Sequence, residues 1–194
     1  MDDKLNVAIY DFDGTLTTES SFIDFLKFYL GKKKALLKFI DNIPSCFGAT
    51  HTSIKEKIFS LFFKGMDVET YNKLCEDFCK NRLSTIIRQD IYQNFLKDIK
   101  EKDMVIVASA SFEDYILPFV KKYGDKAILV ATKTEKANGI VTGKFVGKNC
   151  SKWEKVKRII EIVDLSNAFI SVYTDGFHDK PLISIGNEVH LVKK

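Results

Sequence analysis

The chain has 194 residues, of which 45% are hydrophobic, so it can form one domain, or one domain with a modest insertion, around a sizeable core. Its 30 basic and 26 acidic residues give a formal charge of +4, which excludes the strongly basic character of a dedicated nucleic-acid binder. No apolar run approaches the roughly 20 residues that a membrane-spanning helix needs.

Two further features concern the compartment. The first residues form too short an apolar stretch for a signal peptide, because that stretch runs directly into acidic residues. Cys46, Cys75, Cys79 and Cys150 contain no CxxC pair, and we expect reduced thiols rather than a metal site or disulfides. These features predict a cytoplasmic protein.

The first predicted element is a short buried strand over residues 5–10, which ends in the segment YDFDGTLT, residues 10–17. From residue 21 to about residue 100 the apolar residues instead follow a helical period, and Asp67 is placed as a helix cap. The helices expected in this block cover residues 21–30, 31–43, 53–65, 67–87 and 89–102.

The second half of the chain alternates strands and helices. Strands are expected over residues 103–111, 126–132, 168–174 and 188–192, and helices over residues 113–124 and 151–163. Asn138-Gly139 is a strong hairpin signal after the strand expected over residues 126–132. The order of elements predicts an α/β domain with a helical insertion after its first strand.

Acidic and hydroxyl side chains follow the predicted strands. Asp11 and Asp13 follow the first strand, Ser109 ends the second, and Asp175 ends a later one. Ligands of open parallel sheets bind beyond the carboxyl ends of the strands, so these side chains should converge. Converging carboxylates suit Mg²⁺, which prefers oxygen ligands. With a hydroxyl, a lysine and backbone amides, they form a site for a phosphoryl group, in which one carboxylate acts as nucleophile and another moves the proton.

Four motifs in order resemble those of the haloacid dehalogenase (HAD) superfamily, in its phosphoserine-phosphatase-like branch, subfamily IB. They are YDFDGTLT, VIVASASFEDY, GKNCSKWEKVKRI and YTDGFHDKP. The resemblance implies a Rossmann-like core with a parallel sheet and a C1-type helical cap inserted after the first strand. The corresponding boundaries are residues 1–16 and 101–194 for the core and residues 17–100 for the cap.

The resemblance also implies a role for each matching residue. Asp11 corresponds to the nucleophile and Asp13 to the general acid/base, whose backbone carbonyl also binds the metal. Ser109 and the Ala110 amide correspond to groups that hold phosphoryl oxygens, and Lys155 to the catalytic lysine. The remaining implied positions are Gly14 and Thr15 for substrate binding, and Asp11, Asp13, Asp175 and Asp179 for Mg²⁺.

The chain departs from the family pattern at several positions. Lys152 stands where a glycine is common, which makes it a rival to Lys155 as catalytic lysine. Ser20 occupies the position of the glutamate that binds the amino group of phosphoserine, and Lys57 lies nearest the position of a cap arginine. Because a site built for paired charges rejects ligands it cannot pair, these departures argue against phosphoserine as the main substrate.

The function predicted from these patterns is a Mg²⁺-dependent phosphatase that hydrolyses a small phosphorylated metabolite through an aspartyl-phosphate. One alternative is a phospholipid head-group phosphatase of the phosphatidylglycerophosphate type, for which the lysines at 32–34 between apolar segments would contact the membrane. Another is a catalytically weak binding protein with the same fold. A phospho-signalling receiver and a phosphomutase are less compatible with the long helical insertion and the hydrolytic branch, and the oligomeric state is not indicated.

Overall fold

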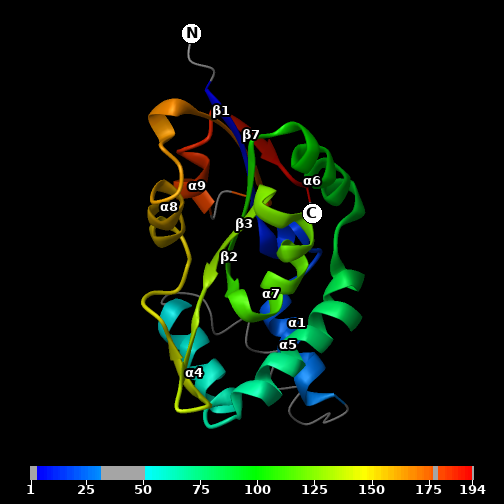
Figure 1. Ribbon diagram of the computed structural model, residues 1–194, viewed down its shortest axis with the longest axis vertical. Coiled ribbons are helices and arrows are strands. Elements are labelled where there is room, and N and C mark those ends of the chain that lie inside the picture. The colour runs from blue at the N-terminus through cyan, green and yellow to red at the C-terminus, as the bar shows by residue number, and fades with distance from the viewer. Residues whose placement is uncertain (1–3, 32–50, 177–178, 194) are drawn as a thin grey trace.

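The computed structural model describes residues 4–31, 51–176 and 179–193 of the chain (Figure 1). The lysines at 32–34, most of the helix expected over 31–43, and Cys46 lie outside these residues. In the described parts of the chain, no helix is both long and apolar enough to cross a membrane.

A sheet of five parallel strands forms the centre of the molecule, in the order β3-β2-β1-β6-β7. The strands are β1 (Leu5–Asp11), β2 (Met104–Phe112), β3 (Ala127–Thr132), β6 (Ala168–Thr174) and β7 (Glu188–Leu191). Since all neighbours run parallel, the polar ends of β1, β2 and β6 meet at one edge of the sheet. The predicted α/β class, with a helical insertion after the first strand, is confirmed.

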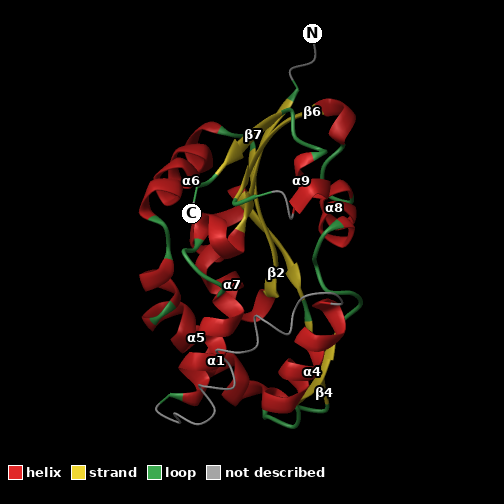
Figure 2. Cartoon of the chain, turned by 180° about the vertical axis from the view of Figure 1, so that it is seen from behind, coloured by secondary structure: helices red, strands yellow, loops and turns green. Residues whose placement is uncertain are grey.

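Helices cover both faces of the sheet (Figures 1 and 2). Successive residues of a strand point to opposite faces, so Ala8 and Tyr10 pack with one cluster of buried residues while Val7 and Ile9 pack with another. The first cluster includes residues of α6 (Gln89–Glu101) and α7 (Glu113–Val120), and the second includes residues of α8 (Trp153–Ile160) and α9 (Lys180–Ile183). The continuous apolar run of each inner strand is therefore explained by burial on both sides.

The insertion after β1 contributes α1 (Ser21–Leu30), α4 (His51–Phe63), α5 (Val68–Asn81) and a 3₁₀ turn, Leu83–Ile86. Its centre is aromatic: the ring of Phe25 lies 5.4 Å from that of Phe63 and 5.1 Å from that of Phe78. The cap expected at Asp67 is confirmed, because its carboxylate accepts a hydrogen bond from the Thr70 backbone N–H at 2.9 Å.

The two connections between insertion and sheet lie side by side. The Thr18 N–H donates to the Ile86 carbonyl at 2.8 Å, and the Arg88 N–H donates to the Leu16 carbonyl at 2.9 Å. Beyond this point α6 packs on the sheet, where Asp98 accepts a hydrogen bond from the Tyr10 hydroxyl at 2.7 Å. We therefore propose that the cap comprises residues 17–87 and that α6 belongs to the core, instead of the boundary at residue 100 expected from the sequence.

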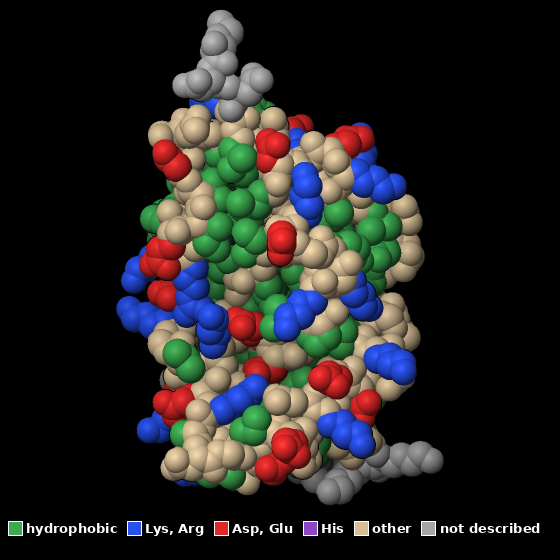
Figure 3. Space-filling model, in the orientation of Figure 1, with side chains coloured by type: hydrophobic (Ala, Val, Ile, Leu, Met, Phe, Trp, Pro, Cys, Tyr) green, Lys and Arg blue, Asp and Glu red, His purple; other side chains and the backbone are tan. Residues whose placement is uncertain are grey.

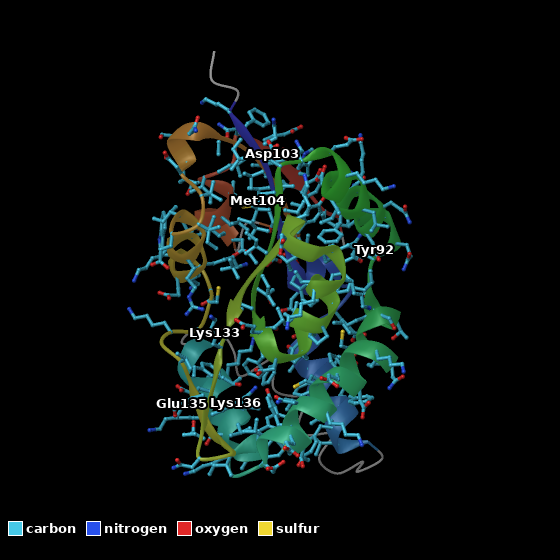
Figure 4. The ribbon with its side chains drawn as sticks, viewed as in Figure 1. Tyr92, Asp103, Met104, Lys133, Glu135 and Lys136 are labelled. Atoms are coloured by element: carbon cyan, nitrogen blue, oxygen red, sulfur yellow. The ribbon has the colours of Figure 1, made fainter. Side chains whose placement is uncertain are left out.

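A hairpin of the core reaches the cap. It consists of β4 (Thr134–Ala137) and β5 (Ile140–Phe145), and its turn at Asn138-Gly139 has positive φ at both residues, as the sequence predicts. Val141 exchanges two backbone hydrogen bonds of 2.8 Å with Gly65 and Met66, directly after α4. Lys136, labelled in Figure 4, donates to Asp114 of α7 at 2.6 Å and to Asn72 of α5 at 3.0 Å. The hairpin thus connects the cap helices to the core.

This contact predicts an unequal response to alanine at two glycines with similar backbone angles. Gly143 has φ +83, and a Cβ there would lie 2.7 Å from Ser60 Oγ and 2.9 Å from Lys64 Cβ, whereas Gly65 has φ +82 and open space around it. Gly65→Ala should cost about 1 kcal/mol of unfolding free energy through its left-handed backbone alone. Gly143→Ala should lower the free energy of unfolding by roughly 1–3 kcal/mol more, because the hairpin must shift away from α4 to make room for the added Cβ. Denaturant unfolding of both variants measures the difference, and equal losses would contradict the described contact.

Candidate active site

A buried lysine joins two carboxylates at the edge of the sheet where the strands end. Lys155 of α8 is 2% exposed, and its ammonium lies 2.7 Å from Asp11 Oδ1 and 2.7 Å from Asp179 Oδ2. Burial by itself lowers the pKa of Lys155, but the two carboxylates more than offset this and raise it above its ordinary value. Without Lys155, the buried Asp11 and the partly exposed Asp179 would face each other with no cation between them.

Asp11 itself is the last residue of β1 and is 7% exposed. Besides Lys155, it is contacted by the Thr15 hydroxyl, which donates to Asp11 Oδ2 at 3.2 Å. Burial raises the pKa of the Asp11 carboxyl, and the charge of Lys155 acts against that rise. On balance the pKa of Asp11 is raised to about 7, so the charge of Lys155 offsets only part of the effect of burial.

Asp13 lies in the tight turn Phe12–Leu16, where Asp13 and Gly14 leave helical backbone angles. Its two carboxylate oxygens are held separately. Oδ1 accepts the Ser21 backbone N–H at 2.6 Å, and Oδ2 accepts the Ser111 hydroxyl at 2.6 Å and the Ser109 hydroxyl at 3.4 Å. The turn and these donors place Asp13 beside Asp11 with a defined orientation.

The end of β2 brings Ser109 and Ala110 to the same edge. Ser109 is fully buried, and its hydroxyl also accepts the Ser111 backbone N–H at 2.9 Å. The Ala110 carbonyl accepts hydrogen bonds from Thr132 at 3.0 Å and from Lys55 at 2.6 Å. The segment that the resemblance assigns to phosphoryl binding is therefore fixed from both the core and the cap.

The donors around Asp11 fit a magnesium ion. A Cβ added to Gly14 would lie 2.5 Å from Asp175 Oδ2, so the Asp175 carboxylate packs against the backbone of the turn that carries Asp13. Within the described ranges, no three His, Cys, Asp or Glu side chains form a metal-binding group. Mg²⁺ commonly uses only one or two carboxylates and retains waters, so Asp11, Asp175 and the Asp13 carbonyl are a sufficient set.

A buried hydroxyl next to these acids supports the same assignment. Thr174 Oγ1 is buried and has no hydrogen-bond partner among the residues that the structure describes. Thr174 ends β6 directly after Tyr173, which pairs with Tyr10, the residue before Asp11. Buried hydroxyls normally have a partner, so this orphaned atom fits a site that gains further polar ligands such as metal-bound water.

Two residues predicted to bind substrate have exposed side chains, although Ser21, which follows the first of them, donates its backbone N–H to Asp13. Ser20 is exposed and precedes α1, and its neighbour Glu19 pairs with Arg82 at 3.3 Å. Arg82 in turn holds Asp24 through two hydrogen bonds of 2.7 and 2.8 Å. Lys57 is exposed on α4.

Lys55, two residues earlier on α4, takes the place expected for Lys57, and sequence reasoning missed it. It is 8% exposed and contacts Ala110 and Ser111. Burial lowers its pKa to about 8, and the charge of Asp13 opposes this fall. A signal was present, because Lys55 precedes the buried residues Ile58 and Phe59 by three and four positions and so shares their helix face.

The contacts also separate the two candidate lysines of α8. Lys155 is buried between carboxylates, whereas Lys152 is exposed and precedes the helix with φ 52 and ψ −127. This backbone conformation is adopted readily only by glycine, which explains why a glycine suits this position. The geometry therefore favours Lys155 as the catalytic lysine.

Comparisons with known proteins agree with this arrangement. A model of the haloacid dehalogenase-like hydrolase family matches residues 8–184. The chain belongs to this family. Its curated relatives include Protein CicA from Caulobacter vibrioides, which is 23% identical over 191 residues, covering 94% of this chain and 83% of that protein.

Solved structures place this haloacid dehalogenase-like hydrolase among phosphoserine-phosphatase-like folds. A Bordetella pertussis Tohama I protein of unknown function has a TM-score of 0.81 at 18% identity, covering 93% of this chain and 86% of that chain. A phosphoserine phosphatase described as a phospho-aspartyl intermediate analogue has a TM-score of 0.64 at 18% identity, covering 96% and 85%. At such identities the likeness establishes the fold, and the roles of the site residues remain predictions.

The strained backbone before α8 yields a stability test. Lys152→Gly should raise the free energy of unfolding by about 1 kcal/mol, because glycine adopts this positive φ without strain. Lys152→Ala keeps the Cβ and is the matched control, for which no gain is expected. Thermal unfolding of both variants decides the point, and a gain shared by alanine would show that the lysine side chain, not the backbone, is responsible.

Proposed function

We propose that the protein is a Mg²⁺-dependent phosphatase that hydrolyses a phosphate monoester through an aspartyl-phosphate on Asp11. The observation that carries this proposal is the buried Lys155 ammonium held 2.7 Å from Asp11, next to the oriented carboxylate of Asp13. A carboxylate beside a lysine can act as a nucleophile, and an adjacent acid that the lysine does not pair with is free to move a proton.

In the first step an oxygen of Asp11 attacks phosphorus, and the bond from phosphorus to the leaving oxygen breaks. Asp13 gives its proton to that oxygen, so the product leaves as an alcohol. Lys155 and the Ser109 hydroxyl offset the negative charge of the transferring group, together with backbone N–H groups of the Gly14 turn and of Ala110. Bound Mg²⁺ would supply further charge neutralisation through Asp11, Asp175 and the Asp13 carbonyl.

In the second step Asp13, now a carboxylate, takes a proton from water, and the water oxygen attacks the phosphorus of the aspartyl-phosphate. The acyl–phosphate bond breaks, inorganic phosphate leaves, and Asp11 is restored. The Ser21 N–H and Ser111 hydroxyl that hold Asp13 support both steps, because the same oxygen must meet first the leaving group and then water.

A small phosphorylated metabolite is the substrate class that we propose. The structure surrounding Ser20 supports the expectation that phosphoserine is not the main substrate, since Glu19 and Arg82 pair with each other and Arg82 with Asp24. Acidic and basic side chains are interspersed over the face in Figure 3, which favours a small ligand over nucleic acid. The lysines on which the lipid alternative depends lie outside the described residues.

Metal removal tests the proposed chemistry. With Mg²⁺, the purified protein should release inorganic phosphate from at least one member of a panel of sugar phosphates, nucleotides, phosphoserine, lysophosphatidate and phosphatidylglycerophosphate. EDTA should abolish the release and added Mg²⁺ restore it. A preference for the two lipids would select the phospholipid alternative. Binding of Mg²⁺ and of a phosphate analogue without release from any member would favour the binding protein.

Substitution of the nucleophile is the second test. Asp11→Asn should lower phosphate release by at least about three orders of magnitude, because the amide cannot form the aspartyl-phosphate. Asp90→Asn is the matched control, since the Asp90 side chain is 66% exposed and contacts only Arg88 among the ion pairs of the described residues. Unchanged folding by circular dichroism accompanies both assays. Full activity in Asp11→Asn would overturn the mechanism.

A further inference from the structure

Lys55 is a buried cation that the mechanism above does not use. Its ammonium donates to the Ala110 carbonyl at 2.6 Å and to the Ser111 hydroxyl at 3.4 Å, and it lies 5.0 Å from the centre of the Phe22 ring. No carboxylate lies within ion-pair distance of it among the described residues. Burial of such a charge is costly, so its place against the end of β2 calls for a specific role.

The hydrogen bonds of Ser111 link Lys55 to Asp13. An ammonium can only donate, so the oxygen of Ser111 accepts from Lys55. The single hydroxyl proton of Ser111 is then left for Asp13 Oδ2, 2.6 Å away, an oxygen that can accept it in either protonation state of the carboxyl group. The positive charge of Lys55 polarises this hydroxyl and strengthens its bond to Asp13.

The chain of contacts begins in the cap and ends at the acid/base of the core. Lys55 belongs to α4, and the next residue, Glu56, accepts the Phe145 backbone N–H of the core hairpin at 2.9 Å. The packing of α4 on the hairpin therefore determines where Lys55 contacts Ser111. If α4 moved away from the hairpin, Lys55 would lose this contact and the Ser111 side chain could rotate away from Asp13.

We propose that Lys55 and Ser111 are positioning residues for Asp13, through which docking of cap helix α4 orients the acid/base for proton transfer. The inference rests on the proposed function, because it assigns to Asp13 the proton of the leaving group. It adds that the cap acts on the chemistry itself, in addition to any contact with the substrate.

The leaving group provides the test. Glycerol phosphate releases a poor leaving group that needs a proton, whereas para-nitrophenyl phosphate releases a stable phenolate that does not. The value of kcat/KM covers the steps up to the aspartyl-phosphate, where Asp13 acts as acid. Lys55→Met and Ser111→Ala should each lower kcat/KM for glycerol phosphate about tenfold to a hundredfold. For para-nitrophenyl phosphate both should stay within about twofold of wild type.

Matched variants separate positioning from damage to the fold. Lys73→Met removes an exposed lysine of the neighbouring cap helix α5 and should leave the rates on both substrates unaffected. Ser111→Thr keeps the hydroxyl and should recover the glycerol phosphate activity that Ser111→Ala loses. Thermal unfolding of each variant, and the para-nitrophenyl phosphate rate itself, report whether the protein is folded.

The remaining outcomes overturn the inference. Equal losses on both substrates would indicate a structural role, and a rise in KM alone would indicate that Lys55 contacts the substrate. Wild-type rates on both substrates in Lys55→Met would show that Lys55 does not position Asp13. Wild-type protein that hydrolyses neither substrate nor any member of the panel would instead overturn the proposed function, and the positioning role with it.

Discussion

The ion pair of Lys155 with Asp11 and Asp179 is the interaction on which the candidate site depends. Its three residues lie in α8, at the end of β1 and directly before α9, so it joins the central strand to two helices that pack on one face of the sheet. A cation between them stabilises two carboxylates that lie close together in a largely buried site. The parallel sheet makes this interaction possible, because it brings the ends of β1, β2 and β6 close to Lys155.

The helical insertion is attached to the core near the same edge of the sheet. Its two connections are hydrogen-bonded to each other between residues 16–18 and 86–88, and the core hairpin holds α4 from the opposite side. The cap is thereby fixed at two separate places over the strand ends. Through Lys55 it also reaches the segment Ser109–Ser111, which holds Asp13. Cap and core are therefore parts of one site, although the cap contributes neither the nucleophile nor the metal ligands that we propose.

Local signals predicted the elements and the strand-end acids well. Asn138-Gly139 predicted its hairpin and Asp67 its helix cap because turn and cap chemistry act over a few residues. The packing of individual side chains and helices was harder to predict from the sequence. Lys55 and Lys57 lie about 200° apart around one helix, and the sequence analysis did not use the spacing that places only Lys55 on the face of the buried Ile58 and Phe59. Similarly, α6 has an amphipathic pattern that fits a cap as well as a sheet, and its contacts with Tyr10 support the proposal that it belongs to the core.

The most direct test of the account is a search for the covalent intermediate. The protein is mixed with a substrate that it hydrolyses, quenched in acid during turnover, and analysed by intact-mass and peptide mass spectrometry. The account predicts one added phosphoryl group, located on Asp11, in the wild type and none in Asp11→Asn. A phosphoryl group on another residue, or steady hydrolysis during which no phosphorylated protein forms, would contradict it.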